Sequence, residues 1–509
     1  MNIKILKKYN TFFLLVLIVG LSVLLRFYRL DDIYVFTIDE EYQATYSWTL
    51  VKDPHPIWIG LPAAAVAFYL GPYFTYFTAI LLALSKGDQM ITAYFAAFIG
   101  VITTFVIFFV GKNVFNLTTG VVTSLLYATL PLFVFYDQKY WNTMFSNLII
   151  LLLFLTLILI RSSKWWWLLY AGLAGAIFET HLPPIPLLLI GVWYFLKGKY
   201  WKDIKLLLLC SVIFLLFYWP LIVFDFNHNF SNLKVFTRLS GQDNQSKISF
   251  NPVAKLATLF DSMGRFWYLK SGSPNADEIN FGCSSLSLSN GYEIINRYTN
   301  RTYASIWLSL VSLIMFLYFL LKSLRDRNSS KKLLAIFLLI AACFFIIYQG
   351  GSYEYYSLGF LMLFTFVPGI LISSFKKNYQ LVALALVILV SAIGINTVLH
   401  TSDEFGLGPK KILIKKVMNI LGENSFSIEG RGICHDYEGW RYLFKVYGRV
   451  PAQSYTDKNL GWLYPEEISK EPPKYTVILS EDRIPLKEDL SGNISIKEGG
   501  YRAYIIKNR

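Results

Sequence analysis

Long runs of hydrophobic residues recur along roughly the first 400 positions, and short polar segments separate them. Each run is close to the length of about twenty residues that a helix needs to cross a bilayer. The pattern predicts about eleven membrane-spanning helices, at residues 11–28, 90–111, 118–135, 144–161, 165–181, 183–197, 205–224, 303–322, 332–349, 356–374 and 379–399. Because about eleven is an odd number, the chain ends are expected on opposite sides of the membrane.

One further apolar segment, GPYFTYFTAILLAL at residues 71–84, is short and rich in aromatic residues. Counting it as a span would place Lys164 and the lysines of 197–205 outside the cell. We therefore expect a helix that lies along the outer membrane interface, where aromatic side chains are common.

Basic residues concentrate in alternate loops, which predicts the orientation of the chain in the membrane. Those expected inside are Lys4, Lys7, Lys8, Lys112, Arg161, Lys164, Lys197, Lys199, Lys202, Lys205, Lys322, Arg325, Arg327, Lys331, Lys332, Lys376 and Lys377. The N-terminus is then cytoplasmic, and the C-terminus is extracytoplasmic. The net charge of +14 is explained by this arrangement, so no nucleic-acid partner is expected.

The last part of the chain lacks such hydrophobic runs. It combines the helical patterns KKILIKKVMNIL and YEGWRYLFKVYG with the strand-like runs YTVILS and YRAYII. The expected fold is therefore a polytopic α-helical membrane domain over residues 1–400, with outer loops at 29–89 and 225–302. A small extracytoplasmic α/β domain follows over residues 401–509.

Composition agrees with a membrane protein, since 55% of the residues are hydrophobic and 17% are aromatic. No Walker loop, dinucleotide glycine pattern, paired CxxC or GxSxG motif is present, so soluble nucleotide cofactors are not indicated. Cys283 and Cys434 both fall on the outer side, where a disulfide between them is open.

Three consecutive acids, Asp39, Glu40 and Glu41, follow the first span among aromatic residues. A sugar transfer to a hydroxyl needs a general base, and Asp39 or Glu40 is placed to serve. The alternative is that these acids are merely solvated and keep the loop out of the cytoplasm. His55, in DPHPIW, is a candidate contact to a metal or a phosphate.

Several segments in a fixed order resemble the membrane glycosyltransferases of the GT-C superfamily, including protein O-mannosyltransferases and aminoarabinose transferases. They are the acidic pair Asp39 and Glu40, the GPYFTY segment, YDQKYWNTMFSNLIILL at 136–152 and WWLLYAGLAGAIFETHLPPIPLLL at 166–189. The resemblance implies that Asp39 is the catalytic base, with Glu40 beside it. It covers about the first 240 residues well and the later spans loosely.

The resemblance also implies substrate contacts in the later segments. The family has an acid where this chain has Asn142, so either Asn142 binds substrate as a neutral group or the acidic role has moved to Asp137. His181, with Glu179 close by, matches a polar position that faces the substrate cavity, although it could simply mark the end of a helix. Further expected contacts are Asp225, His228 and Asn229, and in QGGSYEYYSLGF they are Tyr353, Glu354 and Tyr356.

A lipid-phosphate leaving group carries negative charge, so a cation is expected near it. Arg238, Lys139 and Arg265 are the candidates, and each could instead contact lipid headgroups. No cofactor is certain, and a divalent metal ion is left open.

The sequence thus predicts an enzyme of the cell inner or plasma membrane that takes a hexose or pentose from a polyprenyl-phosphate donor. The transfer would invert the anomeric carbon, and the acceptor is a glycan, a lipid or a protein. The alternatives are a transporter or flippase for lipid-linked glycans, which should bury charges in mid-membrane, and a non-catalytic receptor or assembly factor. No internal repeat supports a transporter built from duplicated halves.

Overall fold

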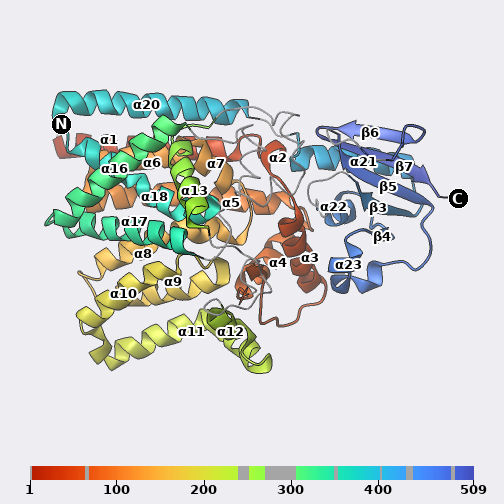
Figure 1. Cartoon of the computed structure of the whole chain (residues 1–509), viewed down its shortest axis with the longest axis horizontal. Coiled ribbons are helices and arrows are strands. Elements are labelled where there is room, and N and C mark those ends of the chain that lie inside the picture. Colours follow the sequence, from red (N-terminus) through yellow and green to blue (C-terminus); the bar gives the residue numbers. More distant parts are fainter. Residues whose placement is uncertain are drawn as a thin grey trace.

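The computed structural model describes residues 3–63, 68–238, 251–269, 305–348, 354–401, 404–431, 439–482, 486 and 488–508, with only the backbone at 3–10 and 236–238. A helical bundle forms one end of the molecule, and a small sheet domain forms the other (Figure 1). Cys283, Cys434, Tyr353 and the side chain of Arg238 lie outside the described residues.

Within the described ranges, seven helical segments are long and apolar enough to cross a membrane, or eight if one bent pair counts as a span. The seven are α5 (Met90–Val110) with η1 (Gly111–Phe115); η2 (Asn142–Phe145) with α8 (Ser146–Leu159); α11 (Ile204–Asn227); α16 (Ile306–Arg325); α17 (Ser329–Ile347); η5 (Glu354–Ser357) with α18 (Leu358–Phe364) and α19 (Phe366–Ser373); and α20 (Lys377–His400).

Further helices complete the bundle. They are α1 (Ile3–Phe27), α9 (Trp166–Thr180), α10 (Ile185–Lys197), η3 (Tyr200–Lys202) and α13 (Pro252–Arg265). The polytopic α-helical fold is as predicted, whereas the total of about eleven spans stays a prediction.

The segment predicted as one span over 118–135 is divided into α6 (Leu117–Thr129) and α7 (Pro131–Asp137), which are bent by 63°. Proline has no backbone N–H and disfavours helical geometry in the residue before it. Leu130 accordingly takes an extended conformation with ψ of 125°. Periodicity of hydrophobic residues continues across this break, which is why the sequence pattern did not show it.

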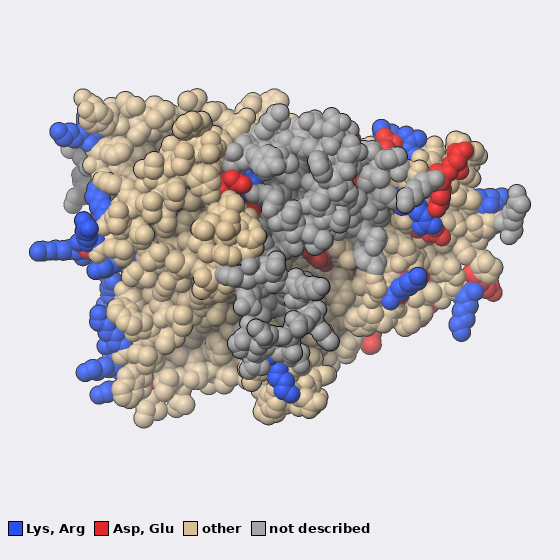
Figure 2. Space-filling view, in the orientation of Figure 1, with Lys and Arg blue, Asp and Glu red and all other residues tan. Residues whose placement is uncertain are grey.

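The two ends of the bundle differ in charge. Lys and Arg gather at the end farthest from the sheet domain, which we call the basic end (Figure 2). The last turns of α10 and α16 carry Lys197, Lys322 and Arg325. The sheet domain packs at the opposite end, which we call the domain-facing end (Figure 1). This separation agrees with the predicted alternation of basic loops, and the orientation of each end across a membrane stays a prediction.

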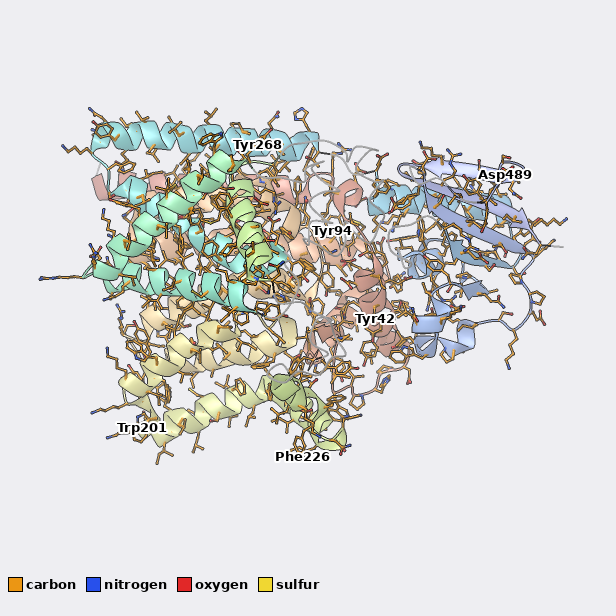
Figure 3. All side chains as sticks on the ribbon, in the orientation of Figure 1. Tyr42, Tyr94, Trp201, Phe226, Tyr268 and Asp489 are labelled. Atoms are coloured by element: carbon orange, nitrogen blue, oxygen red, sulfur yellow. The ribbon has the colours of Figure 1, made fainter. Side chains whose placement is uncertain are left out.

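Helix α11 carries exposed apolar side chains on the outside of the bundle. Its outward leucines are exposed, and Trp201 and Phe226 lie at its two ends (Figure 3). Exposed apolar side chains between aromatic residues are typical of a helix that contacts lipid. The molecule is therefore an integral membrane protein.

The domain-facing end is built from short elements of the first loop. They are α2 (Leu30–Ile33), α3 (Ile38–Lys52), the strand pair β1 (Pro62–Ala63) and β2 (Phe68–Tyr69), and α4 (Tyr73–Ser85). Helix α4 is the helix predicted at 71–84, and it packs against α3. Helix α12 (Ser231–Arg238) joins this layer through Asn232. The side-chain amide of Asn232 accepts a hydrogen bond from the backbone N–H of Tyr69 and donates one to its carbonyl.

The C-terminal domain has a five-stranded sheet in the order β4-β3-β5-β7-β6. Its strands are β3 (Phe426–Gly430), β4 (Gln453–Ser454), β5 (Tyr475–Glu481), β6 (Ile494–Glu498) and β7 (Tyr501–Lys507). Strand β3 pairs in parallel with β4 and β5, and β7 pairs antiparallel with β5 and β6. Its helices are α21 (Leu407–Leu421), α22 (Trp440–Tyr447), α23 (Asp457–Leu460), η6 (Gly461–Leu463) and η7 (Pro465–Glu467). The predicted small α/β domain is confirmed.

This domain is docked firmly on the first loop. One hydrophobic core contains Tyr34 and Phe36 of the loop together with Leu413 and Trp440 of the domain. Leu407 donates its backbone N–H to the Tyr34 carbonyl at 2.8 Å, and Lys410 donates to the Phe36 carbonyl at 2.9 Å. The domain and the loop therefore form one packed unit.

Candidate functional site

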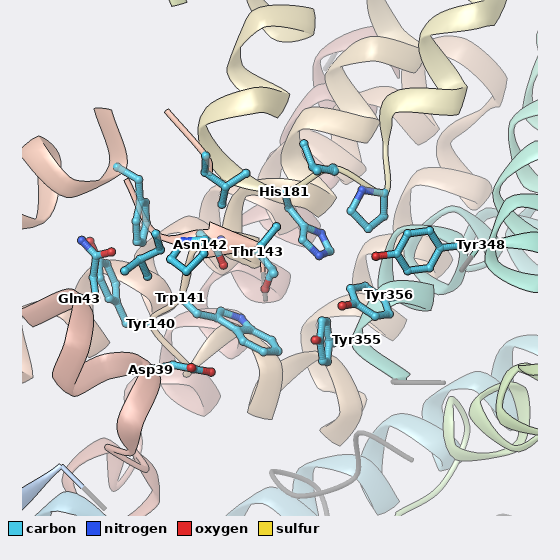
Figure 4. A pocket seen from close by; sticks show the side chains of 17 residues that line it. Asp39, Gln43, Tyr140, Trp141, Asn142, Thr143, His181, Tyr348, Tyr355 and Tyr356 are labelled. Atoms are coloured by element: carbon cyan, nitrogen blue, oxygen red, sulfur yellow. The ribbon is translucent and has the colours of Figure 1, made fainter. Parts of the chain in front are cut away.

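A pocket of about 140 Å³ opens where the bundle, the first loop and α4 meet (Figure 4). Asp39 lies on one side, and Tyr348, Tyr355 and Tyr356 lie on the other, with Trp141 and His181 between them. The lining residues are Asp39, Gln43, Leu61, Pro62, Ala63, Leu70, Phe74, Tyr140, Trp141, Asn142, Thr143, His181, Leu182, Pro183, Tyr348, Tyr355 and Tyr356.

Asp39 lies in the first turn of helix α3, which its neighbour Glu40 caps. The Glu40 carboxylate accepts hydrogen bonds from the backbone N–H of Thr37 at 2.9 Å and from its hydroxyl at 2.8 Å. This reciprocal cap satisfies groups that a helix start would otherwise leave unpaired. Glu40 Oε1 also lies 3.2 Å from Lys139 Nζ, and both side chains are buried. Glu40 therefore lies outside the pocket lining, and Asp39 is the carboxylate that faces the pocket.

The third acid, Glu41, points to the C-terminal domain. Its Oε1 accepts a 2.9 Å hydrogen bond from the backbone N–H of Tyr442, and only 1% of the residue is exposed. Burial raises the pKa of Glu41 from 4.5 to about 7, against the lowering effects of that hydrogen bond and of Lys410 and Arg441. The sequence pattern named this acid without giving it a role.

The middle of the pocket comes from the segment that follows α7. Trp141 is extended, with φ of −156°, and η2 begins at Asn142, so both side chains line the pocket. Lys139 Nζ lies 5.1 Å from the centre of the Trp141 ring. Tyr140 stacks on Phe74 with ring centres 5.2 Å apart, which joins this segment to α4.

Asp137, the other candidate for the acidic role, is held elsewhere. Its Oδ2 accepts hydrogen bonds from Arg26 Nε at 2.9 Å and Nη2 at 2.7 Å, and its Oδ1 accepts one from Tyr127 at 3.1 Å. The guanidinium of Arg26 also donates to the carbonyls of Tyr127 and Ala128. Asp137 thus joins α1 to α6 and α7, and Asn142 is the member of this pair that lines the pocket.

His181 follows α9 directly and lines the pocket. Its ring stacks on Tyr356 at 5.5 Å with an interplanar angle of 10°, and Nδ1 lies 3.4 Å from Ser146 Oγ. Glu179 is not part of the lining, because its carboxylate accepts a 2.8 Å hydrogen bond from the backbone N–H of Tyr73 at the start of α4. A Cβ at Gly71 would lie 1.8 Å from Glu179 Oε1, so a larger residue there would displace the carboxylate.

The tyrosine wall rests on a buried ion pair. Glu354 accepts a 2.8 Å hydrogen bond from Arg265 Nε and one of 3.3 Å from the Tyr136 hydroxyl, and neither partner of the ion pair is exposed. Glu354 therefore lies behind the pocket and anchors η5, which presents Tyr355 and Tyr356. Arg265, a candidate for the lipid phosphate, is the partner in this pair.

The remaining predicted contacts lie away from the lining. His55 is exposed, with Nδ1 2.8 Å from the Asp53 carbonyl. Asp225 accepts a 2.8 Å hydrogen bond from the backbone N–H of Asn232, and His228 stacks on Phe224 at 4.1 Å. Asn229, at a positive φ of 54°, takes part in the turn that ends α11.

Among the residues that the structure describes, no group of three or more His, Cys, Asp or Glu could hold an ion. The divalent metal ion that the sequence analysis left open stays open.

Sequence reasoning did not single out Gln43, Tyr140, Trp141, Tyr348 or Tyr355. Gln43 lies four residues after Asp39, so helical spacing alone could have placed it on the same face. Tyr140, Trp141 and Tyr355 lie inside motifs that were recognised, where one neighbour was named instead.

Comparisons with known proteins agree with the fold. Residues 70–224 match the family described as dolichyl-phosphate-mannose-protein mannosyltransferase. The fold is similar to ArnT from Cupriavidus metallidurans bound to undecaprenyl phosphate, with a TM-score of 0.54 and 11% identity over 96% of this chain and 97% of that one. The apo state of ArnT gives a TM-score of 0.58 and 12% identity over the same shares. No curated protein sequence matches the chain significantly.

The chain thus shares the fold of the two ArnT structures over almost its whole length, in agreement with the fold that the sequence resemblance predicted.

Proposed function

We propose that this chain is a glycosyltransferase that moves a sugar from a polyprenyl-phosphate donor to an acceptor hydroxyl on the extracytoplasmic face, with Asp39 as general base. The observation that carries the proposal is the pocket in Figure 4, where Asp39 faces aromatic and neutral polar side chains at the domain-facing end of the bundle. A buried aromatic pocket with a few polar groups is typical of a small-molecule site.

The arrangement suits an in-line displacement. Asp39 takes the proton of the acceptor hydroxyl while the oxygen of that hydroxyl forms a bond to the anomeric carbon of the donor. The bond from that carbon to the phosphate oxygen breaks, and its electron pair leaves with the polyprenyl phosphate. Because attack and departure occur on opposite faces, the configuration at the anomeric carbon is inverted.

The far wall is suited to the leaving group. The hydroxyls of Tyr348, Tyr355 and Tyr356 can donate hydrogen bonds to phosphate oxygens, and Asn142 and His181 lie between this wall and Asp39. Lys139, which is paired with Glu40, lies over the ring of Trp141, so a cation is adjacent to the pocket lining. The undecaprenyl phosphate in the similar ArnT structure supports a lipid-phosphate ligand here.

Turnover of defined donors tests the proposal. Purified protein in nanodiscs is incubated with undecaprenyl-phosphate hexoses and pentoses together with native membrane lipids and glycans, and released undecaprenyl phosphate is measured. Asp39→Asn keeps the shape of the side chain and removes the base, so turnover should fall by about 10²-fold or more. Binding of the donor should persist.

Asp53→Asn is the matched control, since Asp53 ends the same helix and 91% of its side chain is exposed. It should transfer at the wild-type rate. Undiminished turnover in Asp39→Asn would rule out the base, and movement of donor across the bilayer without transfer would identify a flippase instead.

A further inference from the structure

We propose that Glu41 is a positioning residue, which fixes helix α3 to the C-terminal domain and thereby holds Asp39 at the pocket. The inference rests on the proposed function, because it explains how the proposed base, Asp39, is kept in place. It also gives the C-terminal domain a part in the reaction although that domain contributes no residue to the described pocket lining.

Contacts on two sides fix the first turn of α3. On one side, Glu40 caps the helix and lies 3.2 Å from Lys139 of the bundle. On the other side, Glu41 receives the N–H of Tyr442 in the first turn of α22. Asp39 precedes these two residues directly, so a shift of either anchor moves the carboxylate.

The partner helix is itself held tightly. Gly439, which precedes α22, has a φ of 77°, and a Cβ there would lie 2.3 Å from the Phe36 ring. The Tyr442 hydroxyl donates to the Gly87 carbonyl at 3.1 Å. Helix α22 therefore lies in one position against the first loop, and Glu41 transmits that position to α3.

The groups that face Glu41 explain how firmly it is held. Lys410 on α21 and Arg441 on α22 attract its charged form, Tyr464 after η6 lies within electrostatic range, and Asp39 and Glu40 share its own helix. Arg441 also lies 3.3 Å from Asp457, so its charge is shared. Ionised Glu41 gains attraction to Lys410 and Arg441 that the protonated form lacks.

Because burial raises the pKa of Glu41 to about 7, its charge changes near neutral pH. Below this pKa the carboxyl is protonated, and its hold on α22 is reduced to the hydrogen bond. We therefore expect kcat to fall as the pH is lowered from 8 to 6. Glu41→Gln should lose this part of the dependence of kcat on pH and should keep any part that arises from the titration of other groups.

Two variants separate positioning from simple folding. Glu41→Leu removes the acceptor and should lower kcat about tenfold or more with little change in the donor KM, because the misplaced base acts only in the chemical step. Glu41→Gln keeps the hydrogen bond but not the charge, so its kcat should lie between those of Glu41→Leu and of the wild type at pH 8. Ser427→Ala is the control, since it removes a 3.2 Å hydrogen bond to Thr476 inside the sheet of the same domain, and it should keep kcat.

Hydrogen exchange supplies a measurement that does not need turnover. The backbone of residues 38–44 should exchange faster in Glu41→Leu than in the wild type or in Ser427→Ala. Unchanged exchange there, or a kcat loss of equal size in Ser427→Ala, would overturn the role of Glu41. Wild-type protein that transfers no sugar would contradict the proposed function instead, while the exchange result would still decide on Glu41.

Discussion

The buried ion pair between Arg26 and Asp137 joins helices α1, α6 and α7. Arg26 is fully buried, and Asp137 is nearly so. Removing one partner leaves the other charge buried without compensation, which typically destabilises a protein by about 3–5 kcal/mol. The structural role of Asp137 therefore predicts a stability effect.

Asp137→Leu should lower the unfolding free energy of the detergent-solubilised protein by about 3 kcal/mol or more. The double variant Arg26→Met with Asp137→Leu should recover most of the loss, because neither charge is then left alone. Asn142→Ala, at the pocket, should reduce turnover with little effect on stability. An Asp137→Leu protein as stable as the wild type would contradict this assignment.

The same residues show what sequence alone can determine. The DEE run was recognised as a candidate site because a sugar transfer to a hydroxyl needs a general base, and Asp39 was chosen through family resemblance. Which acid faces the pocket depends on Thr37, Lys139 and Tyr442, the last of which is 401 residues from Glu41 along the chain. Thr37 and Glu40 have the spacing of a capping box, which the sequence analysis did not use. Lys139 and Tyr442 are distant partners that leave no local pattern, so the role of Glu41 could not be read from spacing.

At the scale of elements, η5 shows how a turn can be fixed from behind. Its first residue, Glu354, is paired with Arg265 of α13, and the two following tyrosines face the pocket. If this wall binds the donor equally in the ground state and the transition state, its displacement should change KM more than kcat.

Glu354→Gln should therefore raise the donor KM several-fold, and it should also lower the melting temperature because the Arg265 charge loses its partner. Steady-state kinetics over a range of donor concentrations measures the effect. Ser357→Ala is the control, since it removes a hydrogen bond to the Glu354 carbonyl within the same turn. A loss confined to kcat would place Glu354 in the chemistry instead.

Hydrophobic runs predicted most of the bundle because membrane helices must satisfy their own backbone, which leaves length and polarity as sufficient signals. The break at Pro131 and the short helices α2 and α3 of the first loop were not predicted. The geometry of α3 depends on contacts such as the ion pair between Glu40 and Lys139, which hydrophobicity does not report.

At the scale of the whole molecule, the two ends of the bundle carry different charge, and this separation predicts the membrane orientation (Figure 2). Cysteine substitutions at exposed positions provide the test. Asp53→Cys at the domain-facing end should react with a membrane-impermeant maleimide added to intact cells, whereas Lys164→Cys should react only after the membrane is opened.

The two substitutions control each other, because both native side chains are solvent-accessible. Labelling of Lys164→Cys from outside, with protection of Asp53→Cys, would invert the orientation and remove the basis for an extracytoplasmic reaction.

The bond between Glu41 and Tyr442 also bears on the biogenesis of the protein. Residue 442 is synthesised long after residue 41, so this bond can form only after the domain that carries Tyr442 has been made and has folded. A nascent polypeptide without that domain would carry Asp39 without its support. Under the proposed function, sugar transfer would begin only after this folding step, which would protect the lipid carrier from premature consumption by unfinished chains.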